Sequence, residues 1–491
     1  MFLKAGAVSL ALLLLSRLLG LARESAQAAA FGASGLADAA VLMLTLPDWL
    51  AGMLASGALA YVLLPHWAHE SPVQQATTQR RVARALLLTG VALAVALWLA
   101  RAPVLAALAP GLPQVLQSGA ADALGWSALA VPMALLAALW ATRLQHERDF
   151  TGLYGANLVV NGTLVITILI VANYHYSAWA MTRLGLGLLV AFGLRLAWLH
   201  WRLTWHADGV KAGASPTGGD TATDRFPHAS LWWWAALSAG LPLALPFAAR
   251  SMASQSGEGA LAIFNYAWKL VELPLVLAIQ LVATLAFPVV TRAFAGESAP
   301  ADAVRRAFAL AWTLACAAAA GLLVGAPAVA RLLFGWGRMG PDGLALVSAW
   351  GRVAAWGLLP QALIAVALTV LAVQGRMRAV VLAYAAALAA LLALGGRDGA
   401  QLMAGLNLAL GGVAVVSLVA LGREVPRWLP WRSGLAPLAA LLVLAGLMRV
   451  DGFPLQSFGT VAGLLAAGMA AIAVVAVGWI TGPDLRAALR R

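Results

Sequence analysis

Residues 22–47 read ARESAQAAAFGASGLADAAVLMLTLP, and residues 249–274 read ARSMASQSGEGALAIFNYAWKLVELP. The two stretches align without a gap at an offset of 227 residues, and eight of the 26 positions are identical. The identical pairs include Arg23 and Arg250, Gly32 and Gly259, Leu46 and Leu273, and Pro47 and Pro274, while Asp38 falls opposite Asn265. This internal similarity indicates that the chain contains two related halves.

The composition identifies the solvent in which these halves fold. Of the 491 residues, 62% are apolar and only 10% are charged, and the mean hydropathy is +0.87. A soluble domain of this size needs far more polar surface to cover its core. Apolar runs of about 20 residues recur along the whole chain, and each is long enough to cross the bilayer as a helix. The sequence therefore predicts an all-α polytopic membrane protein.

Fourteen segments satisfy this length criterion. We expect transmembrane helices at residues 5–30, 36–64, 82–100, 122–142, 152–173, 176–200, 229–252, 258–290, 304–334, 342–372, 378–395, 399–421, 433–449 and 457–480. The repeat matches the first two of these helices to the seventh and eighth. Six helices repeated in the same orientation, with two more at the end, resemble the parallel repeats of transporters, in which the pathway lies between the halves.

The same reading predicts four segments along the chain. Residues 1–202 form an N-terminal six-helix lobe, the polar stretch 203–228 is a flexible cytoplasmic linker, residues 229–425 form a second six-helix lobe, and residues 426–491 add two helices and a tail. With the N-terminus inside, Lys and Arg fall mostly on the cytoplasmic side, as the positive-inside rule requires. We therefore attribute the net charge of +13 to topology and expect no nucleic-acid partner.

Several classes of protein are disfavoured by what the sequence lacks. It has no GxxxxGK[ST] loop, so we expect no ATPase activity in this chain. Its single cysteine, Cys316, cannot form an intramolecular disulfide or a cysteine metal cluster. The seven histidines lie in loops or at helix ends, which disfavours a metal site inside the membrane. We therefore expect a transporter that is not an enzyme and needs no metal or cofactor.

Charged residues inside the predicted spans indicate where a substrate binds, because such residues are costly in lipid and usually face a wet interior. They lie mostly in the first two helices of each half: Arg17, Arg23, Glu24, Asp38, Asp48, Arg250, Lys269 and Glu272, with Arg352 apart in the tenth span. If Glu24 sits near an interface, the cations outnumber the acids. An excess of guanidinium groups suits a polyanion, because the planar fork binds phosphate oxygens in pairs.

We therefore predict one substrate-binding cavity formed by Arg17, Arg23, Asp38, Arg250, Lys269 and Glu272. The alternative is that each of these charges snorkels to an interface or belongs to a structural ion pair. A cavity for a cationic drug would be net acidic, so the cationic excess disfavours a multidrug exporter. A scaffold that transports nothing is a further alternative.

The chain resembles the MurJ/MviN lipid II flippases of the MOP transporter superfamily. The resemblance is concentrated in the first two predicted helices, and weaker similarity follows in the second half. The matching residues are Ser16-Arg17-Leu18-Leu19-Gly20-Leu21-Ala22-Arg23-Glu24, Phe31-Gly32-Ala33, Ala37-Asp38-Ala39, Leu46-Pro47-Asp48, Ser56-Gly57-Ala58 through Pro65, Phe150 with Asn161, and Tyr266-Ala267-Trp268-Lys269-Leu270 with Glu272 and Pro274.

The resemblance implies two six-helix lobes around a V-shaped cationic cavity, with the last two helices forming a groove for a lipid tail. We expect a monomer in the bacterial inner membrane, and the positive-inside rule places both termini in the cytoplasm. Its substrate would be a lipid-linked diphosphate sugar, the peptidoglycan precursor lipid II, moved from the cytoplasmic to the periplasmic leaflet among membrane lipids. The family's substrate residues correspond to Arg17, Arg23 and Asp38, and Lys269 stands where the family usually has arginine.

Two departures from the family pattern keep the cargo open. Ala51 and Gly52 occupy positions where the family typically has a pair of arginines. The family's Asp-x-Lys-Thr-Pro signature after the tenth helix has become Arg376-Met377-Arg378-Ala379-Val380. The cargo is therefore either lipid II or another polyprenyl-linked glycan, of the exopolysaccharide or O-antigen type.

Overall fold

The structure is a computed structural model that describes residues 2–53, 57–173, 179–211, 228–297, 299–394, 398–449 and 459–489. All regular secondary structure in these ranges is helical, and they contain no β-strand. Ten of the described helices are long and apolar enough to cross a membrane, or eleven if the bent pair Pro341–Ala355 and Leu358–Val373 forms one span. The prediction of an all-α polytopic membrane protein is confirmed.

The remaining predicted spans also fall on helices. Two shorter apolar helices, Arg378–Ala393 and Trp431–Leu447, occupy the eleventh and thirteenth predicted positions. The first span lies on the N-terminal helix Phe2–Phe31. Within the described residues, each of the fourteen predicted ranges therefore coincides with helical structure.

Backbone contacts divide the chain into Met1–Leu243 and Ala244–Arg491, which we call unit 1 and unit 2. The helices of unit 1 are α1 (Phe2–Phe31), α2 (Gly35–Met53), α3 (Leu59–Trp67), α4 (Pro72–Leu99), α5 (Arg101–Leu108), α6 (Gln114–His146), α7 (Phe150–Asn173) and α8 (Ala180–Lys211). The first part of α9 (Ala229–Ala253) also belongs to unit 1.

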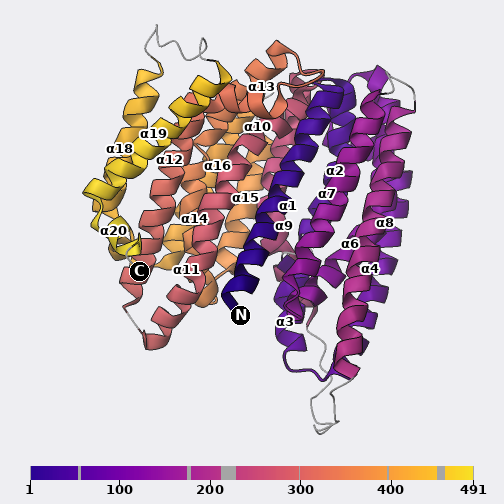
Figure 1. Cartoon of the computed structure of the whole chain (residues 1–491), viewed down its shortest axis with the longest axis horizontal. Helices are drawn as coiled ribbons and strands as arrows, with labels where there is room; N and C mark the ends of the chain where they lie inside the picture. Colours follow the sequence, from indigo (N-terminus) through magenta and orange to yellow (C-terminus); the bar gives the residue numbers. More distant parts are fainter. Residues whose placement is uncertain are drawn as a thin grey trace. The chain divides into compact units, whose positions relative to one another are not determined.

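Helix α6 is the centre of unit 1, because α2, α4 and α8 all pack against it (Figure 1). Its buried face includes small residues such as Ala134 and Ala138, which let neighbouring membrane helices approach closely. Larger side chains fill the space beside them, where Leu63 and Trp67 of α3 pack with Leu139. Helix α1 lies against α7, and its C-terminal end is followed directly by α2.

Unit 2 begins within α9 and contains the rest of the helices. They are η2 (Ser254–Ser256), α10 (Ala260–Pro274), η3 (Leu275–Gln280), α11 (Leu281–Arg292), η4 (Ala293–Glu297), α12 (Pro300–Phe334), α13 (Pro341–Ala355), α14 (Leu358–Val373), α15 (Arg378–Leu394), α16 (Gly399–Leu421), α17 (Val425–Trp428), α18 (Trp431–Leu447), α19 (Thr460–Thr481) and α20 (Pro483–Leu489).

Helix α12 is the centre of unit 2, and α19 packs along it through small residues. A Cβ atom placed on Gly325 would lie 2.3 Å from the Cβ of Ala467, so glycine is required for this approach. Polar contacts fix the ends of the added helices. Arg305 of α12 bonds Asp484 of α20 at 2.9 Å, and the Ser433 hydroxyl of α18 donates to the same carboxylate at 2.9 Å. The last helices are therefore anchored to α12.

The repeated stretch has the same local geometry in both units. Gly32 follows α1 with a φ of 65°, and its counterpart Gly259 precedes α10 with a φ of 79°. Side chains are strained in this left-handed region, which explains why glycine stands at both positions. Pro47 and Pro274 both lie inside their helices, and the π-helix η3 follows the second of them. These shared features support the internal repeat.

The boundaries of the four predicted segments remain a prediction. Helix α8 continues to Lys211, past the predicted end of the first lobe, and residues 212–227 of the predicted linker lie outside the described residues. The contact boundary falls within α9 because the first half of this helix packs on α3, where Ala235 is buried against Ala58 and Val62.

Candidate anion-binding site

Arg23 of α1 forms the most enclosed ion-pair cluster among the predicted site residues of unit 1. Its side chain is 11% exposed, and it donates from Nη2 to Glu24 at 2.8 Å and from Nη1 to Asp48 of α2 at 2.9 Å. Within the described residues, its Nε atom is buried and has no acceptor. Arg23 is therefore held between two carboxylates and retains one buried donor.

Glu24 is enclosed together with Arg23. It is buried, with 5% of its surface exposed, and it pairs with Arg23. This pairing neutralises a charge that the sequence analysis counted as surplus. The cationic excess expected for the first half is therefore smaller than predicted.

Arg17 and Asp38 have opposite environments in unit 1. Arg17 is exposed on α1 and makes no ion pair or hydrogen bond with another described residue. Asp38 is 1% exposed in the first turn of α2, where the helix dipole favours a negative charge. An external anion can therefore reach Arg17 without displacing any described partner.

In unit 2, the corresponding arginine has a neutral partner. Arg250 of α9 donates to the amide oxygen of Asn265 on α10 at 2.9 Å, and its guanidinium lies 5.0 Å from the ring centre of Phe247. The repeat places Asn265 opposite Asp38 in the alignment, so an amide replaces a carboxylate at this position. Arg250 therefore gains an oriented acceptor that contributes no negative charge.

Lys269 and Glu272, one turn further along α10, form their own ion pair. The Lys269 Nζ lies 2.7 Å from Glu272 Oε2, and the two side chains are 23% and 32% exposed. Because both side chains are partly exposed, solvent or a ligand can reach this i,i+3 ion pair. Glu272 therefore orients Lys269 and offsets part of its charge.

The structure also reveals a buried cation that the sequence analysis did not identify. Arg195 lies on α8 with 9% of its surface exposed, and its guanidinium stacks over the ring of Phe192 at 6.0 Å. The signal was present, because position 195 lies inside the predicted span 176–200, on the helical face that includes the buried Leu188 and Leu199. The predicted site includes only residues from the first two helices of each half, and α8 is not among them.

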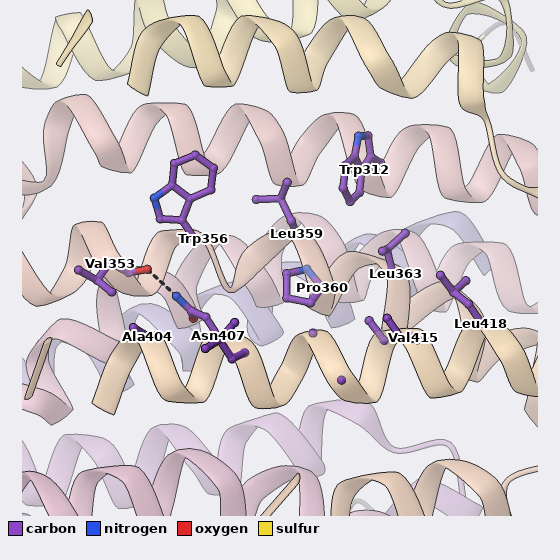
Figure 2. Close-up of a pocket in the computed structure, with 14 residues that line it drawn as sticks. Trp312, Val353, Trp356, Leu359, Pro360, Leu363, Ala404, Asn407, Val415 and Leu418 are labelled. Carbon is purple, nitrogen blue, oxygen red and sulfur yellow. Dashed lines mark hydrogen bonds between the residues drawn. The ribbon is translucent and has the colours of Figure 1, made fainter. Parts of the chain in front are cut away.

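Unit 2 also has an apolar groove with a volume of about 790 Å³. Figure 2 shows its lining, which comes from α12, α13, α14 and α16 and includes Trp312, Leu359 and Leu363. Asn407 brings an amide to the lining, and its Nδ2 donates to the backbone oxygen of Val353 at 2.6 Å. None of the described residues that line the groove is charged, so the groove suits hydrocarbon and not a phosphate.

A bend beside this groove depends on a glycine. Helices α13 and α14 meet at 45°, and Gly357 lies at the break. A Cβ on Gly357 would lie 2.4 Å from Asn407 Oδ1. The close approach of α16 to the bend therefore requires a residue without a side chain.

The chain is similar to known proteins in both sequence pattern and fold. The family model described as lipid II flippase MurJ matches residues 27–480. Among curated proteins, no sequence matches the chain. The solved structure of the lipid II flippase MurJ in its inward closed conformation is similar at a TM-score of 0.76 and 15% identity, covering 96% of this chain and 99% of that one.

Two transporters of the MOP superfamily share the fold at greater distance. An inward-facing multidrug resistance MATE transporter has a TM-score of 0.64 at 13% identity and covers 88% of this chain and 96% of its own. A transporter from Pyrococcus furiosus, described as having a binding pocket of reverse polarity, has a TM-score of 0.55 at 15% identity, with 89% and 94% covered. At these identities, the similarity establishes the architecture alone.

Proposed function

The chain belongs to the MurJ family of lipid II flippases, and from this premise we propose that it moves lipid II from the cytoplasmic to the periplasmic leaflet of the bacterial inner membrane. Lipid II is a polyprenyl-diphosphate-linked peptidoglycan precursor. In this proposal the protein is a monomeric transporter and not an enzyme, and both of its termini are cytoplasmic.

The observation on which this proposal rests is the state of Arg17. A guanidinium that is exposed on α1, within a predicted span, and bonded to no other described residue is available to an incoming anion. Lipid is a poor environment for such a group, so its retention favours contact with a wet interior and a charged ligand. The fork geometry of arginine suits the paired oxygens of a diphosphate.

The other site residues take different roles in the proposal. Arg250 and Lys269 contribute further positive charge, and Asn265 and Glu272 orient them. Arg23 binds phosphate only after one of its two carboxylates has moved away. Asp38 holds a buried negative charge that favours a nearby arginine.

A second cargo, another polyprenyl-linked glycan, is favoured by the structure around Ala51 and Gly52. Ala51 is buried, and a Cβ on Gly52 would lie 3.5 Å from a methyl carbon of Leu243. These positions therefore form helix contacts, whereas the family typically has arginines there. The diphosphate chemistry is the same for both cargoes, and the difference lies in the sugar.

Complementation distinguishes these functions. The chain is expressed in cells depleted of their own lipid II flippase, beside an Arg17→Ala variant at matched expression. Rescue of growth, with lipid II no longer accumulating in the cytoplasmic leaflet, supports lipid II as cargo. Binding of a polyprenyl-linked exopolysaccharide unit without rescue supports the second cargo. Failure to bind either lipid refutes the flippase proposal.

A further inference from the structure

Arg195 is enclosed in unit 1 without a direct ionic partner. Its side chain is more than nine-tenths buried, and its Nε atom has no acceptor within the described residues. It also forms no ion pair with any described acid, and its observed contact is with the ring of Phe192. A buried guanidinium in this state is costly unless a counter-ion reaches it at some stage.

Asp48 is the acid placed to be that counter-ion. Helix α2, which bears Asp48, packs against α8, which bears Arg195, so the two charges lie on adjacent helices. In the structure this carboxylate is bonded to Arg23 at 2.9 Å. The helix that bears Asp48 therefore packs against both arginine-bearing helices, and Asp48 contacts only one of the two arginines.

The distribution of charge around Arg23 makes an exchange favourable. Arg23 is bonded to both Glu24 and Asp48, so two acids surround one cation while Arg195 has none in contact. The Asp48 side chain is 39% exposed, which leaves it room to turn, whereas Glu24 is buried. An anion that binds Arg23 would repel Asp48 first.

We propose that Arg195 is the alternative counter-ion of Asp48, and that Asp48 moves from Arg23 to Arg195 when a phosphate group binds Arg23. Arg195 is thus a positioning residue that frees Arg23 for its ligand without touching the ligand itself. The inference rests on the proposed function, because it requires a diphosphate lipid as substrate. It adds a residue and a step to that function.

A double-mutant cycle tests the exchange in the full-length protein in nanodiscs, with undecaprenyl diphosphate as the probe and binding measured by native mass spectrometry. The four proteins are the wild type, Arg195→Leu, Asp48→Asn and the double variant. We expect Arg195→Leu to weaken binding about tenfold in the wild-type background, because Asp48 then stays on Arg23. With Asp48→Asn present, the same change should alter binding less than about twofold, because a neutral amide needs no counter-ion.

Two further variants separate positioning from structure. Arg195→Lys keeps the charge and should recover most of the affinity. Arg183→Leu removes another cation from α8 and serves as the matched control, with an expected change below about twofold. Thermal unfolding of every variant reports on folding, so a loss of binding with an unchanged midpoint cannot come from misfolding.

Each remaining outcome contradicts the inference. Equal losses from Arg195→Leu in both backgrounds would make Arg195 a direct ligand or a structural residue. No loss of binding in either background would show that Asp48 leaves Arg23 even when the Arg195 side chain is absent. If the wild type binds undecaprenyl diphosphate but shows no coupling, only this inference fails. If the wild type does not bind it, the proposed function fails as well.

Discussion

Arg17 is exposed on α1 and bonded to no other described residue. Removing its side chain therefore costs no described residue a hydrogen bond or an ion pair. We expect Arg17→Ala to abolish flipping while changing the free energy of unfolding by less than about 0.5 kcal/mol, as is usual for exposed sites. A desolvated guanidinium–phosphate contact contributes about 2–5 kcal/mol, and solvent in an open cavity reduces this. Arg17→Lys should restore only part of the rate, because a point charge cannot replace the fork.

The assay for this prediction is accumulation of lipid II in the cytoplasmic leaflet, measured beside expression level and thermal stability. Normal transport by a well-expressed Arg17→Ala protein would contradict the role given to this residue. A large loss of stability would instead show that Arg17 is structural.

Arg202 provides a contrasting case in which stability is at stake. It donates from Nε and Nη2 to both oxygens of Asp149, at 2.9 and 2.8 Å, and the Asp149 side chain is only 5% exposed. We expect Arg202→Ala to destabilise the protein by about 3–5 kcal/mol, because a buried carboxylate loses its cationic partner while it keeps the hydrogen bond from the Gly152 N–H. Thermal unfolding in detergent measures this change.

The matched control is Arg427→Ala, which breaks an exposed pair with Glu424 whose side chains are 78% and 53% accessible. Such a surface pair contributes at most about 1 kcal/mol. Equal shifts for the two variants would show that Asp149 is not enclosed as described.

The sequence identified the charged residues more reliably than their partners. Arg17, Arg23 and Asp38 stand out because charges are rare in apolar runs. The partners of Arg23 depend on which helix faces meet, and Asp48 lies 25 residues away in sequence. Arg195 was missed because its position near the end of a span resembles that of an ordinary interfacial cation.

At the scale of helices, Gly325 determines how closely α19 approaches α12. A Cβ there would lie 2.3 Å from the Cβ of Ala467. We expect Gly325→Leu to displace α19 and destabilise unit 2 by at least about 1–3 kcal/mol, as overpacking does in other cores. The midpoint of thermal unfolding measures the loss.

Gly468 on α19 provides the control for this substitution. It is exposed, and a Cβ there would meet no atom within 4 Å. Gly468→Leu should leave stability nearly unchanged. If both variants unfold at the same temperature, close packing of α19 on α12 does not contribute to stability.

Helices were predictable because each predicted span is an apolar run, and within the described residues each run falls on helical structure, although α15 and α18 are shorter than the other spans. The bends and breaks within these helices were harder to predict from the sequence. At the bend, Gly357 leaves room for Asn407 of α16, a contact across 50 residues that no local pattern encodes. The groove beside the bend was likewise not predicted, since the resemblance implied a groove formed by the last two helices.

At the scale of the whole molecule, the predicted membrane topology decides which loops face the cytoplasm and which face the periplasm. We expect a maleimide that cannot cross the membrane to leave Gly213→Cys unlabelled in intact cells, because the predicted linker 203–228 is cytoplasmic. Gly340→Cys, in the exposed turn before α13, should react because it is predicted to face the periplasm. Both variants are made with Cys316→Ala, which removes the single native thiol. Labelling of Gly213→Cys alone would invert the orientation.

The source of energy follows from the same charges. The chain has no ATP-binding loop, so transport should proceed without ATP. Moving one charge through the membrane field is worth about 2.3 kcal/mol per 100 mV. We therefore expect transport to depend on membrane potential, because cations within the predicted spans would move in this field.

The most direct test measures flipping of fluorescent lipid II by the purified chain in sealed vesicles, without ATP and with an imposed potential. We predict that the wild-type protein flips lipid II, that the potential changes its rate, and that the Arg17→Ala, Arg250→Ala double variant is inactive at equal incorporation and thermal stability. Normal flipping by that double variant would contradict the central claim, because these arginines would then be structural and not part of the diphosphate site.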